Sequence, residues 1–101
     1  MVTIERMVQT VYPGKWEALE AIDKRYNVVE GRLGFPKNKK RYQLVVGGDS
    51  DILIVERQWD SMAQMEAAYE KAFADPELQA LQKEITSIIQ SNKIELYMPL
   101  P

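Results

Sequence analysis

The chain contains no cysteine and no histidine, and these two absences narrow its chemistry considerably. Without cysteine it forms no disulfide, thiolate nucleophile, iron–sulfur cluster or thiolate zinc site. Without histidine it lacks the commonest general base and a common metal ligand. Only oxygen ligands are left, so we expect no bound transition metal.

Long apolar runs and an excess of positive charge are also missing. No stretch approaches the ~20 apolar residues of a membrane span, and the first residues form no signal-peptide core. We therefore expect no membrane partner and a cytoplasmic location. The 13 basic and 15 acidic side chains give a formal charge of −2, without the basic excess that favours binding to a phosphate backbone. Nucleic acid is accordingly excluded from the expected partners.

What is present predicts one domain over residues 1–101, a length that supports a core of its own. Val2–Val11 mixes β-branched and polar residues in the manner of a strand. Apolar residues at spacings of three and four then predict an amphipathic helix that starts at Trp16. Gly31 and Gly34 suit the end of this helix and the turn after it.

The second half of the chain predicts a hairpin, a broken helix and a last strand. Strands over Arg41–Val46 and Ile52–Trp59 flank a five-residue loop rich in glycine and aspartate. Ser61, with a glutamine three residues later, fits a capping box that begins a helix. Asp75-Pro76 provides an N-cap and a first-turn proline, which restart the helix. Apolar residues alternate with other residues over Ile94–Met98, as in a strand.

This βαββαβ order predicts an α+β fold, a ferredoxin-like sandwich with one antiparallel sheet and helices on one face. The strands carry apolar residues on both faces, for example at Ile52, Leu53, Ile54 and Val55. A sheet covered on one side only is expected to be polar on the other. We therefore expect a homodimer in which two copies pack sheet to sheet and form an α+β barrel.

Three short motifs carry a family resemblance. They are Pro13–Lys15 after the first strand, Glu30–Phe35 after the first helix and Trp59–Ser61 after the third strand. Together with the order of elements, they resemble the antibiotic-biosynthesis-monooxygenase group of the dimeric α+β-barrel superfamily, which also includes the NIPSNAP proteins. The resemblance in element order covers essentially the whole chain.

The resemblance implies a homodimer with a pocket between sheet and helices in each protomer. Some members oxidise aromatic or quinol substrates without metal or flavin, so we expect no cofactor. Members often have a glutamate two residues before this tryptophan, where the chain has Arg57. They also often have a histidine on the following helix, where the chain has Ala68 and Tyr69.

The candidate ligand-binding residues come from two strands and one helix. Alternation places Arg57 and Trp59 on the same face of their strand. We expect Trp59 and Tyr69 to approach each other on the helix-facing side, with Arg57 nearby, where the two rings could wall a ligand pocket or simply fill the core. Arg6 and Glu56, on neighbouring strands, could orient a ligand in a partly apolar pocket or form a structural ion pair.

Two functions follow from these features, and the catalytic residues stay unassigned. In the first, the chain binds a small apolar, aromatic or polyketide-like compound. If it is an enzyme, the resemblance implies a cofactor-independent monooxygenase. Because histidine is absent, its base would be a carboxylate or tyrosine, unless the substrate ionises itself. In the second, the chain is a non-catalytic dimerisation or ligand-sensing module whose own side chains fill the pocket. A cavity of a few hundred Å³ with converging polar groups would favour the first.

Overall fold

The computed structural model describes all 101 residues, and its elements follow the expected order. The strands are β1 (Thr3–Val11), β2 (Lys40–Gln43), β3 (Ile52–Trp59) and β4 (Ile89–Tyr97). The helices are α1 (Trp16–Arg32), α2 (Met62–Phe73) and α3 (Pro76–Ile85). None of the helices has the length and apolarity that crossing a membrane requires.

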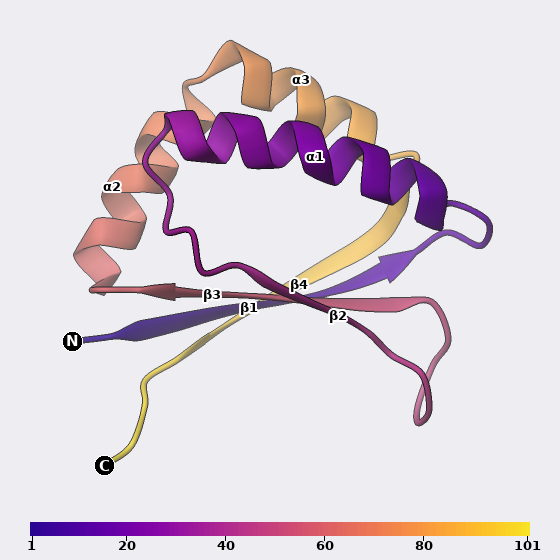
Figure 1. Ribbon diagram of the computed structural model, residues 1–101, viewed down its shortest axis with the longest axis horizontal. Coiled ribbons are helices and arrows are strands. Elements are labelled where there is room, and N and C mark those ends of the chain that lie inside the picture. Colours follow the sequence, from indigo (N-terminus) through magenta and orange to yellow (C-terminus); the bar gives the residue numbers. More distant parts are fainter.

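The sheet has the order β2-β3-β1-β4, and all its neighbouring strands are antiparallel. All three helices lie on one face of the sheet and leave the opposite face bare (Figure 1). This is the predicted ferredoxin-like α+β sandwich. The two central strands, β1 and β3, therefore present one face to the helices and the other to the outside.

Strict alternation along β3 decides which side chains enter the core. Leu53, Val55, Arg57 and Trp59 are buried, as predicted for one shared face, whereas the residues between them are more exposed. The apolar members pack against buried residues of the helices, including Leu19, Ile22, Met65, Leu78 and Leu81. The helix-facing side of the sheet thus forms the floor of the core.

Both predicted N-cap residues, Ser61 and Asp75, stand at the starts of their helices, but only Ser61 makes a capping hydrogen bond. Ser61 Oγ accepts a hydrogen bond from the backbone N–H of Gln64 at 3.0 Å, and Gln64 Oε1 accepts one from the N–H of Asp60 at 2.7 Å. Asp75 is the N-cap of α3, but its carboxylate makes no cap hydrogen bond. It accepts from Arg32 at 2.6 Å instead and so joins the end of α1 to the start of α3.

Two predicted strand boundaries are wrong. β2 ends at Gln43, and Val45 and Val46 are 90% and 87% exposed in the following loop. Their β-branched side chains favour a strand, but no partner strand pairs with them, so local preference does not prevail. β4 starts at Ile89, well before Ile94, because its polar first half pairs with the end of β1 despite lacking an alternating pattern.

The face of the sheet away from the helices carries apolar side chains on its two central strands, as predicted, beside the charged Arg6 and Glu56. Ile4 and Val8 on β1 and Ile54 on β3 lie on this outer face, half-buried by their neighbours in the sheet. Tyr42 of β2 stands opposite Ile54 and is half-exposed. No helix lies on this face of the sheet (Figure 1).

Candidate functional site

A cavity of about 420 Å³ lies between the sheet and the helices. Its walls come from all three helices and from β1, β3 and β4, and 13 of its 23 lining residues are hydrophobic. The polar residues that line the cavity include Glu30, Lys39, Arg57 and Tyr69. The space is therefore apolar over most of its surface, with a charged cluster at one place.

The cluster begins at Glu5, a carboxylate buried behind the cavity wall, whose side chain is only 3% exposed. Its Oε1 accepts hydrogen bonds from Trp59 Nε1 at 3.1 Å and from Arg57 Nη1 at 3.4 Å. Its Oε2 accepts a hydrogen bond from the Tyr69 hydroxyl. β1 and β3 position the two charges, because Glu5 and Arg57 are direct partners in their antiparallel register. Each oxygen of the carboxylate thus has a donor, as a buried charge requires.

Arg57 is buried to the same degree and joins the two central strands to α1. Its Nη2 lies 2.9 Å from Glu30 Oε1, and its guanidinium carbon lies 4.9 Å from the centre of the Phe35 ring. The contact with the ring adds a cation–π interaction to the two ion pairs. Its Nε–H has no hydrogen-bond partner. Arg57 is therefore held on several sides and keeps one unused donor.

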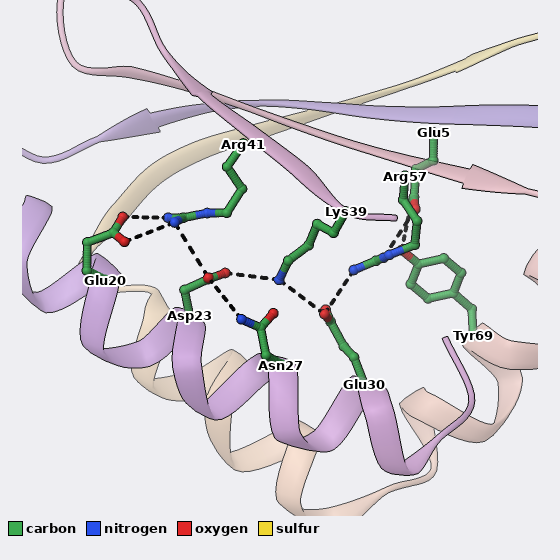
Figure 2. A network of polar contacts seen from close by, with 9 residues as sticks. All are labelled: Glu5, Glu20, Asp23, Asn27, Glu30, Lys39, Arg41, Arg57 and Tyr69. Carbon is green, nitrogen blue, oxygen red and sulfur yellow. Dashed lines mark hydrogen bonds and ion pairs between the residues drawn. The ribbon is translucent and has the colours of Figure 1, made fainter. Parts of the chain in front are cut away.

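From Arg57 a chain of alternating charges runs along α1 to the surface (Figure 2). Glu30 Oε1 also pairs with Lys39 at 3.2 Å, and Lys39 pairs with Asp23 at 3.0 Å. Arg41 then lies 3.5 Å from Asp23 and 2.7 Å from Glu20, whose side chain is more than half exposed. These ion pairs join residues that are far apart in the sequence into one network, which runs from β3 to the N-terminal part of α1.

The two cavity tyrosines stay protonated near neutral pH. Burial, reinforced by the Glu5 carboxylate, raises the pKa of Tyr69 far above its ordinary value. Burial and the nearby Glu30 raise the pKa of Tyr26 to about 12. Both hydroxyls are therefore donors and weak acceptors, and a group that takes up a proton in this cavity has to be a carboxylate.

The predicted grouping of Arg57, Trp59 and Tyr69 on the helix-facing side is present. The ring centres of Trp59 and Tyr69 lie 5.8 Å apart, and Arg57 Nη1 lies 3.5 Å from the Tyr69 hydroxyl oxygen. Arg57 and Tyr69 line the cavity, but Trp59 does not. Phe35, whose ring centre is 5.2 Å from that of Trp59, lines the cavity in its place. The indole is fully buried and supports the wall from behind.

Arg6 and Glu56 are direct partners in the register of β1 and β3, as expected for neighbouring strands. Both occupy the alternate positions of their strands, on the face away from the helices, because their sequence neighbours Glu5 and Arg57 point toward the helices. They therefore do not line the cavity.

Glu5, Glu30 and Lys39 are the site residues that sequence reasoning missed. A signal existed for Glu5, because it occupies the same strand face as Met7 and Val11, so alternation places a carboxylate beside Arg57. No comparable signal existed for Lys39, which lies between α1 and β2 and reaches Glu30 only through the tertiary fold.

The fold and the site together define a ferredoxin-like sandwich with an internal cavity and a buried charged cluster on its wall. No model of a known protein family matches the chain, and no curated protein sequence matches it. The similarity to solved structures, in contrast, is extensive.

A NIPSNAP family protein from Agrobacterium tumefaciens superposes with a TM-score of 0.82 at 15% identity, over 98% of this chain and 86% of the other. An uncharacterised NIPSNAP domain protein from Burkholderia xenovorans gives 0.82 at 15% identity, over 97% and 94% of the two chains. A variant of SnoaB, described as a cofactor-independent oxygenase from Streptomyces nogalater, gives 0.70 at 12% identity, over 97% and 92%. The predicted resemblance to the antibiotic-biosynthesis-monooxygenase and NIPSNAP group is thus confirmed in the fold.

Proposed function

We propose that the chain binds a small aromatic or polyketide-like compound in the cavity between its sheet and its helices. The observation that carries the proposal is the cavity itself, because about 420 Å³ falls within the ~300–1,000 Å³ of small-molecule sites. Its largely apolar lining suits a flat hydrocarbon framework. A pocket filled by the protein's own side chains, the alternative function, would leave no such space.

The polar part of the wall gives the ligand an orientation. Arg57, Tyr69 and Glu30 lie together on one side of the cavity, and the rings of Phe35 and Phe73 line it near them. An aromatic ligand with an oxygen substituent can stack or pack against these rings while its oxygen meets the charged cluster. The proposal therefore favours hydroxylated aromatic compounds over pure hydrocarbons.

The fold shared with the SnoaB variant supports a second, catalytic candidate. Cofactor-independent oxygenation by this chain would start from an ionised hydroxyaromatic substrate, and O₂ would be the oxidant. Because the chain has no histidine and both cavity tyrosines stay protonated, the proton acceptor would be a carboxylate, unless the substrate ionises by itself. Oxygen uptake by the protein with a hydroxyaromatic compound, absent with the compound alone, would support this candidate.

Binding is tested with 1,8-dihydroxyanthraquinone in isothermal titration calorimetry. At about −0.3 kcal/mol per atom over ~18 non-hydrogen atoms, we expect a Kd on the order of 100 µM. Ile94→Trp, at a half-exposed position of the cavity wall, should abolish this binding because the indole fills the space. Leu96→Trp is the matched control, since Leu96 has the same strand orientation but does not line the cavity.

Undiminished binding to the Ile94→Trp protein would place the ligand elsewhere, and no binding to the wild-type protein would contradict the proposed function. Equal loss in the Ile94→Trp and Leu96→Trp proteins would also count against the cavity, because only one of the two positions lies on its wall. Circular dichroism of both variants checks that each is folded.

We propose further that two copies pair through the outer face around Ile4, Val8 and Ile54. These apolar side chains lie on the central strands of a sheet face that no helix covers, and their burial against a second such face favours pairing. Light scattering at micromolar concentration should give a mass twice that of the 11.7 kDa chain. Ile54→Lys should give monomers, whereas Val28→Lys, at an exposed position of α1, should leave the dimer intact. A monomeric wild-type protein would contradict the dimer.

A further inference from the structure

The charged network beside the cavity has one more carboxylate than it has cations. It contains four carboxylates and three cations, all connected by ion pairs: Glu5, Glu20, Asp23, Glu30, Lys39, Arg41 and Arg57. Tyr26 and Tyr69 add no charge near neutral pH, because their pKa values are raised. The network therefore offers no uncompensated cation.

One carboxylate oxygen beside the cavity has no side-chain donor. Both oxygens of Glu5 and both oxygens of Asp23 interact with donors of the protein. In Glu30, Oε1 pairs with both Arg57 and Lys39, at 2.9 and 3.2 Å. No side chain donates to Oε2 of Glu30. Because Glu30 lines the cavity and this oxygen is not a buried atom, it can accept a hydrogen bond from water or from a ligand.

Arginine often binds anions, but the charge of Arg57 is already compensated by two carboxylates of the protein. Glu5 lies 3.4 Å from one terminal nitrogen and Glu30 lies 2.9 Å from the other. The guanidinium is 2% exposed, so these ion pairs act at low effective dielectric and are poorly screened. A carboxylate ligand entering the cavity would meet two fixed carboxylates for this one cation.

We propose that the cavity selects neutral hydroxyl compounds, phenols or enols, whose O–H donates to Glu30 Oε2, and that it rejects aromatic carboxylates. This inference rests on the proposed function and names the chemical class of its ligand. A hydrogen bond from a neutral hydroxyl to a carboxylate is charge-assisted and needs no counterion.

Three naphthalenes of nearly equal size show whether the cavity prefers a neutral hydrogen-bond donor, a neutral compound without a donor, or an anion at pH 7. 2-Naphthol is neutral and has an O–H donor, 2-methoxynaphthalene is neutral without a donor, and 2-naphthoate is an anion. Calorimetry with the wild-type protein should show 2-naphthol binding about tenfold more tightly than either of the others, as expected for one charge-assisted hydrogen bond.

Glu30→Gln removes the charge and keeps the shape of the side chain. We expect the Kd of 2-naphthol to rise about tenfold and the Kd of 2-naphthoate to fall about tenfold, because Arg57 then has one carboxylate less beside it. Glu20→Gln is the matched control, since it removes the same charge from the same helix and network at an exposed position off the cavity wall. It should change neither Kd by more than about twofold.

The outcomes distinguish this inference from the proposed function. If the wild-type protein binds neither the naphthalenes nor 1,8-dihydroxyanthraquinone, the proposed function fails. If it binds 2-naphthoate as tightly as 2-naphthol, the cavity is a ligand site and the selection by Glu30 is wrong. The same conclusion follows if Glu30→Gln weakens both ligands equally. The wild-type comparison decides the matter even if the Glu30→Gln protein does not fold.

Discussion

Replacing Arg57 by leucine should lower the free energy of unfolding by about 3–5 kcal/mol, the range for breaking a buried ion pair by removing one partner. The loss arises because Glu5 and Glu30 then stay behind without their shared cation, and the Glu5 side chain is only 3% exposed. Leucine fills part of the space but offers no donor to either carboxylate. Urea denaturation followed by far-ultraviolet circular dichroism measures the change.

Arg25→Leu is the control for this experiment. Arg25 pairs with Glu84 at 2.7 Å, closer than Arg57 to Glu5, but both side chains are about half exposed. Solvent screens such a pair, so the denaturation midpoint should hardly move despite the shorter distance. A similar, small effect of both substitutions would show that the Arg57 cluster is solvated in solution and would contradict the buried network.

Removal of the indole in Trp59→Ala should cost about 3–5 kcal/mol, the range for a large aromatic side chain in a packed core. Trp59 is fully buried between β3 and the Phe35 and Tyr69 rings, so neighbouring side chains cannot fill the void without moving the cavity wall. The substitution should also weaken the binding of 1,8-dihydroxyanthraquinone, because Phe35 and Tyr69 lose their support. The proposed dimer should persist, since Trp59 faces the helices.

The two tryptophans provide a matched comparison of the indole N–H alone. Each donates to a carboxylate, Trp59 to Glu5 at 3.1 Å and Trp16 to Asp51 at 2.8 Å. Trp59→Phe leaves a buried acceptor without one of its donors, which costs about 1–3 kcal/mol. Trp16→Phe removes the shorter hydrogen bond at a half-exposed position, where water replaces it, and should cost about 1 kcal/mol or less. Equal losses, or dissociation of the Trp59→Ala dimer, would contradict this placement of Trp59.

Most of the fold could be predicted because its elements have clear periodicities. Alternation in Ile52–Trp59 identified the buried face residue by residue, and Asp75-Pro76 marked the break between two helices. The errors fell where local preference and pairing disagree. Val45 and Val46 have the side chains of a strand and no partner, whereas residues 91–93 have polar side chains and partners in β1.

The candidate site could be predicted only in part, because it is built by contacts between distant segments. Alternation in the third strand places Arg57 on the helix-facing side, and helical spacing places Tyr69 on the apolar face of the next helix. These two patterns were enough to predict that the two side chains lie close together. That Trp59 lies behind the cavity wall depends on Phe35, from the segment after α1. Glu30 joins the site through its pairs with Arg57 and Lys39, which no spacing in the sequence encodes.

A crystal structure of the protein with 2-naphthol tests the central claim most directly. We expect density for the ring system between the sheet and the helices, against the Phe35 ring, with the ligand hydroxyl within hydrogen-bond distance of Glu30 Oε2. We also expect a second copy packed on the outer face around Ile54. A ligand bound on that outer face, or a cavity that collapses onto its own side chains in the crystal, would contradict the proposed function.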